Sequence, residues 1–196
     1  MRSNLVFATL LVSVGAMSAS TPKLNIKSRH GTSREERTKQ QVERLAAQYD
    51  LKKFTKTRDI IIEQGAIAHA YPTLTMNCRF VDDDDLALSQ YVHEQGHWVL
   101  QPNHPPNNPG LSDELQRLVP GLPIAYPAGA GDVRSTYYHL AVILLEWQGL
   151  EELIGPERAR KVMEWKRSDH YTAIYDAVLK QRAELEKMLK RWGIHW

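Results

Sequence analysis

The run LALSQYVHEQGHWVL, residues 86–100, constrains the fold of this chain more than any other feature. Its apolar spacing predicts a helix, and His93 and His97 stand four positions apart, which places both imidazoles on one helical face. Two imidazoles so placed can bind one zinc ion, and Glu94 stands beside them, where a carboxylate can take a proton from a metal-activated water. Gly96 disfavours a helix, so its presence indicates close packing next to His97. The alternative is a pair of surface histidines on an amphipathic helix.

A catalytic zinc site needs a third protein ligand, and the segment STYYHLAVILLEWQGLEELIGP is where we expect it. Its apolar composition predicts a buried helix that Ser135 caps and Gly155 ends. Glu146 lies between leucines and a tryptophan, where a carboxylate is costly unless it is paired or metal-bound. His139 is seven positions earlier, on the same face, and imidazole is an equally good zinc ligand. Both are possible third ligands, and we favour Glu146.

The long connection between these two helices, residues 101–134, is rich in turn-forming residues. It contains His104, a further histidine, which we interpret as polar surface. A connection of this length is often functional, so it could form a rim over the metal, or it could be a packed surface loop.

Composition predicts one folded domain: 42% of the 196 residues are hydrophobic, 24% are charged, and the formal net charge is +2. Residues 1–20 have the order of a signal peptide, with Arg2 before an apolar run and small residues after it. We therefore expect a secreted or periplasmic protein with no stable membrane span. The single cysteine, Cys78, cannot form an intrachain disulfide and is expected to be a buried, inert thiol.

Residues 21–58 carry 11 Lys and Arg against 4 Asp and Glu. Ser33 and Glu36 form a capping-box pattern before an amphipathic helix at 34–49. A basic helix can bind an anionic membrane or nucleic acid, but no aromatic side chains are interleaved for base stacking, so we expect a solvated helix and no nucleic-acid partner.

From residue 59 onward, the pattern predicts a small sheet followed by helices. The expected strands are 60–63, 66–70 and 74–81. Asp82 to Asp85 could bind a hard cation, but we favour their acting as the start of the next helix. Helices are expected at 156–167, after Pro156, and at 171–192. His170, Tyr171 and Tyr175 could assist at the metal site or simply pack.

The sequence HEQGH, followed by a buried glutamate in a second helix, resembles the gluzincin division of the zincin metallopeptidases. The spacing of Glu146 and Gly149 is also similar to the ExxA ligand helix of several zincin families. The resemblance implies that His93, His97 and Glu146 hold Zn²⁺ and that Glu94 is the general base. It further implies that His139 stabilises the oxyanion or orients the site.

On this basis we predict an α+β, zincin-like fold: a small sheet beside the HEQGH helix and a mostly helical C-terminal half. The expected organisation is a signal peptide at 1–20, a basic helical segment at 21–58 and a metallopeptidase domain at 59–196. The expected function is zinc-dependent hydrolysis of a peptide or protein substrate. The alternatives are a non-catalytic zinc-binding or structural envelope protein, and an interaction module in which the HEQGH match is accidental.

Overall fold

A computed structural model describes residues 23–101 and 109–196 and has the expected α+β class. The expected signal peptide at 1–20 and His104 lie outside the described residues. The strands are β1 (Asn25–Ser28), β2 (Asp59–Ile62) and β3 (Leu74–Met76). The helices are α1 (Ser33–Gln48), α2 (Asp84–Leu100), α3 (Pro109–Leu118), α4 (Val133–Ile154), α5 (Pro156–Lys166) and α6 (Thr172–Arg191). No helix of the described ranges is long and apolar enough to cross a membrane.

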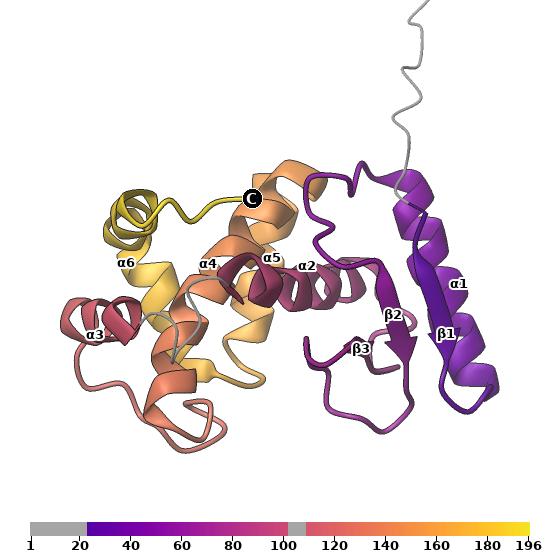
Figure 1. Cartoon of the computed structure of the whole chain (residues 1–196), viewed down its shortest axis with the longest axis horizontal. Coiled ribbons are helices and arrows are strands. Elements are labelled where there is room, and N and C mark those ends of the chain that lie inside the picture. Colours follow the sequence, from indigo (N-terminus) through magenta and orange to yellow (C-terminus); the bar gives the residue numbers. More distant parts are fainter. Residues whose placement is uncertain (1–22, 102–108) are drawn as a thin grey trace, which may run out of the picture.

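The three strands form one parallel sheet in the order β1-β2-β3, with Ile60 of β2 opposite both Ile26 and Leu74. Helix α1 connects β1 to β2 and packs on both strands, while α2 packs on β3. The sheet and α1 lie at one end of the molecule, and α3 and α6 lie at the other (Figure 1). The central strand residues are buried under these helices, as is usual in a parallel sheet.

The N-terminal elements agree with the sequence predictions in part. The helix expected at 34–49 is α1, but its capping box uses Thr32 and Glu35, one residue before the expected pair. The basic segment also supplies β1, which is four residues long with only Ile26 buried and so gives little pattern to detect. The strand expected at 66–70 is reduced to a single bridge between His69 and Thr75. The strand expected at 74–81 ends at Met76.

The four consecutive aspartates start α2, as predicted. The side chain of Asp83 accepts a hydrogen bond of 3.0 Å from the backbone N–H of Leu86, which caps the helix. Asp84 accepts two hydrogen bonds of 2.7 Å from Arg44 on α1. Asp85 pairs with Arg158 on α5. These carboxylates therefore join α2 to its neighbouring helices.

Helix α4 is the centre of the molecule and contacts α2, α3, α5 and α6. Its cap is Asp132, which accepts a 2.8 Å hydrogen bond from the backbone N–H of Ser135, the expected cap. Gly155 ends it at a φ of +82°, a backbone conformation that favours glycine, and α5 then begins at Pro156. The final helices occupy nearly the predicted ranges.

The tightest contact between α2 and α4 is at Gly149, whereas Gly96, where we expected close packing, faces α4 with room for a Cβ atom. A Cβ atom added at Gly149 would lie 2.8 Å from Cγ1 of Val92, whereas one at Gly96 would lie 3.6 Å from the nearest atom, an ordinary contact. The glycine that matters for packing is thus on α4.

This difference predicts opposite effects of the same substitution. Gly149→Ala should destabilise the protein by about 1–3 kcal/mol because the added methyl group overpacks the helix interface. Gly96→Ala should be neutral or stabilising by up to about 1 kcal/mol, because alanine favours a helix. Urea unfolding of both variants measures the two free energies, and a larger loss for Gly96→Ala would contradict this packing.

Candidate metal centre

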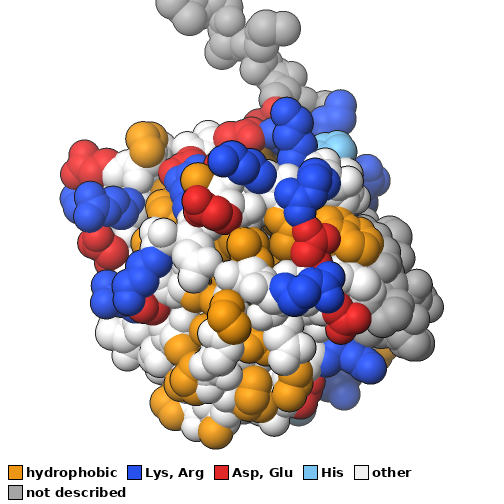
Figure 2. Space-filling view, turned by 90° about the vertical axis from the view of Figure 1, so that its left-hand side faces the viewer, with side chains coloured by type: hydrophobic (Ala, Val, Ile, Leu, Met, Phe, Trp, Pro, Cys, Tyr) orange, Lys and Arg blue, Asp and Glu red, His pale blue; other side chains and the backbone are white. Residues whose placement is uncertain are grey.

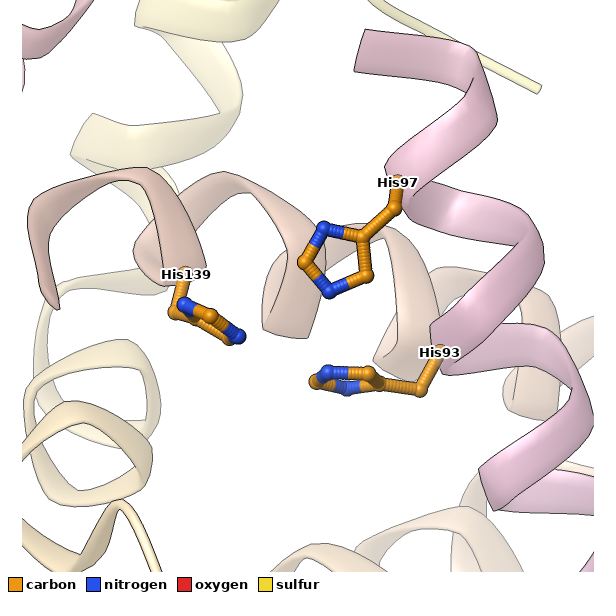
Figure 3. Close-up of side chains that lie close together, drawn as sticks. All are labelled: His93, His97 and His139. Carbon is orange, nitrogen blue, oxygen red and sulfur yellow. The ribbon is translucent and has the colours of Figure 1, made fainter. Parts of the chain in front are cut away.

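Three imidazoles meet between α2 and α4. His93 and His97 lie one turn apart on α2, and His139 projects toward them from α4 (Figure 3). One potential ligand atom of each residue lies within 4.8 Å of those of the other two. The ring centroids are 5.0–5.6 Å apart. Three convergent imidazoles are a donor set that suits zinc and related transition metals.

Glu146, which we favoured as the third ligand, lies behind His93 instead of in this cluster. Its carboxylate accepts a hydrogen bond of 2.9 Å from Nδ1 of His93 and others from the hydroxyl groups of Ser89, at 2.5 Å, and Tyr175, at 2.9 Å. Because a carboxylate only accepts, Nδ1 of His93 carries the proton, and Nε2 is the nitrogen left for a metal. The structure thus places His139, the alternative, where we expected Glu146.

The hydrogen bonds explain how Glu146 is tolerated in the core. Burial alone would raise its pKa, but the hydrogen bond and charge of His93, the charge of Lys166 and the hydrogen bond from Ser89 together hold the pKa below its usual value. The carboxylate therefore stays ionised among apolar side chains. This is the arrangement by which an acidic partner fixes the ring of a metal-binding histidine.

His139 is oriented by its own helix. Its Nδ1 donates a hydrogen bond of 2.7 Å to the backbone carbonyl oxygen of Ser135, four residues earlier, which leaves Nε2 to face the cluster. Burial and repulsion from His93 lower the pKa of His139 to about 3, so the ring is neutral, as a metal ligand must be. Its place in the cluster makes His139 a candidate ligand, whereas the resemblance implied that it stabilises the oxyanion or orients the site.

Glu94 lines the same cavity as the three histidines and is 5% exposed. Burial raises its pKa to about 7, and the charges of His93 and Lys166 oppose that rise. A carboxyl group with a pKa near neutrality can both accept and return a proton, which is the property that general acid–base catalysis requires.

The cavity around the cluster has a volume of about 850 Å³, within the range of sites that bind small molecules or peptide segments. The segment 66–71 forms one wall, and Ile67 there is 85% exposed. Tyr126, from the connection between α3 and α4, is 67% exposed at another wall. Away from this cavity, on the face of the molecule that holds α3 and α6, apolar side chains gather at the lower end and charged side chains dominate the upper part (Figure 2). The connection, for which a rim and a packed surface loop were both open, contributes Tyr126 and Asp132 to the cavity.

The sequence reasoning missed several cavity residues, of which Lys166 is the most buried cation, and left the roles of His170 and Tyr171 open. Lys166 ends α5, where a basic residue normally only complements the helix dipole, so no pattern singled it out. His170 and Tyr171 both line the cavity, and the Tyr171 ring centroid lies 4.5 Å from that of His139. The φ of Tyr171 is +52°, a left-handed conformation that costs a non-glycine residue about 1–3 kcal/mol and is often found at functional sites. Tyr175 instead supports Glu146.

Comparisons with known proteins do not extend this description: no family model, no curated protein and no solved structure matches the chain.

Proposed function

We propose that the protein is a zinc-dependent metallopeptidase in which His93, His97 and His139 hold the metal. The observation that carries this proposal is the convergence of three imidazoles beside the buried carboxyl group of Glu94, in one cavity. Hydrogen bonds to Glu146 and to the Ser135 carbonyl fix two of the three rings, as expected for metal ligands. The HEQGH resemblance to zincins supports the same class, although the third ligand would be a histidine of α4.

The roles of the residues follow from their positions. When bound, zinc would polarise the scissile carbonyl group and lower the pKa of a water molecule. Glu94 would take a proton from the attacking water and later give it to the leaving amine, because its raised pKa suits both steps. Burial and repulsion from Glu94 raise the pKa of Tyr171, so its phenol stays protonated and can donate a hydrogen bond to the developing oxyanion. Secretion or periplasmic export remains part of the proposal and rests on the sequence of residues 1–20.

The test is metal-dependent cleavage of an unfolded protein or a peptide library. We expect fragments from the zinc-loaded protein, none after treatment with a chelator, and recovery when zinc is added back. Zinc that binds only the folded state should also stabilise it by about 2.7 kcal/mol at a free concentration of 100 times its dissociation constant, so the melting temperature should fall on chelation. Zinc binding without cleavage would favour a non-catalytic zinc protein, and no binding would contradict the metal site.

A further inference from the structure

Lys166 is a buried cation that faces the same cavity. It is 3% exposed and lines the cavity together with His93 and Glu94. Within residues 23–101 and 109–196, its ammonium group makes no hydrogen bond or ion pair. Its Nζ lies 5.0 Å from the centroid of the Phe80 ring, at the distance of a cation–π contact. Burial of an ammonium group without an ion pair lowers the stability of the folded state.

The neighbouring charges do not supply a dedicated partner for Lys166. Glu164, two residues before Lys166, pairs with Arg160. Asp169, three residues after it, accepts two hydrogen bonds, of 2.8 and 2.5 Å, from Arg79 and one of 2.6 Å from His170. Glu146 accepts its hydrogen bonds from His93, Ser89 and Tyr175. Glu94 attracts Lys166 electrostatically without an ion pair. The ammonium group is therefore left to face the cavity.

We propose that Lys166 binds a carboxylate group of the substrate, so that the cavity selects peptides with a negative charge near the scissile bond. This inference rests on the proposed function for the cleavage step, while the binding of a carboxylate does not depend on it. An incoming carboxylate would offset the cost of the buried ammonium group. Arg134 adds a second cation to the same walls, whereas Arg79 is paired with Asp169, and the walls also carry the carboxyl groups of Glu94 and Asp132.

The carboxylate can come from the C-terminus of a peptide or from an Asp or Glu side chain. Matched probes separate these sources: a short alanine peptide with a free or an amidated C-terminus, and an end-blocked alanine peptide with one internal Glu or Gln. Calorimetry of the chelator-treated protein measures binding without any contribution from a metal. We expect one carboxylate probe to bind at least ~10-fold more tightly than its neutral match, the scale of a hydrogen bond to a charged group.

The preference should disappear in Lys166→Met and persist in Lys161→Met, which removes an exposed lysine of the same helix. If Lys166→Met does not fold, Lys166→Gln replaces it, and the comparison of probes on the parent protein remains decisive. Equal binding of both members of each pair, or a preference that survives the loss of Lys166, would overturn the proposal.

Cleavage of the same probes by the zinc-loaded protein separates this proposal from the proposed function. Lys166-dependent carboxylate binding without cleavage would support the subsite and contradict the peptidase. Cleavage at equal rates for charged and neutral probes would support the peptidase and contradict the subsite. If both proposals hold, the KM for the favoured carboxylate peptide should rise at least ~10-fold in Lys166→Met, while the KM for its neutral match stays unchanged.

Discussion

Glu94→Gln is expected to lower peptide turnover by ~10²- to 10⁴-fold, the range by which a positioned general base accelerates a reaction. The substitution keeps the shape of the side chain and removes only its ability to accept a proton. Because Glu94 lines the cavity without belonging to the histidine cluster, the variant should still bind zinc in a one-to-one ratio. The measurement is kcat for a peptide that the parent protein cleaves, together with the zinc content of each preparation.

The matched control is Glu43→Gln, the same chemical change at an exposed position of α1 that does not line the cavity. It should leave both turnover and zinc content unaltered. If Glu94→Gln cleaves as fast as the parent protein, Glu94 is not the base and the proposed mechanism fails. If it loses zinc as well as turnover, its main role is structural.

The second large effect concerns the metal. His139→Ala removes one of the three imidazoles of the cluster. Losing a residue that only hydrogen-bonds to a metal ligand lowers metal affinity ~10- to 100-fold, and we expect the loss of the ligand itself to lower zinc affinity by more than that. Glu146→Gln should stay within that smaller range, since an amide oxygen can still accept the hydrogen bond from His93 but carries no charge. Competition with a chromophoric chelator measures both affinities.

His69→Ala provides the control, because His69 lines the same cavity but is not part of the three-histidine cluster. It should bind zinc like the parent protein. The opposite order, with Glu146→Gln losing more affinity than His139→Ala, would return the third-ligand role to Glu146 and contradict the arrangement of the rings.

The local features of this chain were predictable from its sequence. The helix around HEQGH, its aspartate start, the buried helix α4 and the break at Gly155 and Pro156 each depend on residues adjacent in the chain. The pairing of His93 with His97 was predictable for the same reason, since a helix fixes the spacing of positions four apart. Short elements were the exceptions, because β1 and the segment 66–70 contain too few buried positions to show a period.

What only the tertiary structure decided was which residue of α4 meets these histidines. His139 and Glu146 lie on one face of α4, two turns apart, so the sequence places both toward α2 without fixing the register between the helices. The helices pack antiparallel, with Val92 close to Gly149 and Gly96 close to Val142. That register brings His139 to His97 and leaves Glu146 beside His93.

The sequence also showed that Glu146 must have a partner, because a carboxylate among leucines needs one, but it did not show which. The partners come from two other helices: His93 and Ser89 on α2 and Tyr175 on α6. Lys166 reaches the cavity from the end of α5 in the same way. A chain determines its helices through near neighbours, whereas the metal centre is built from side chains that become neighbours only when those helices pack.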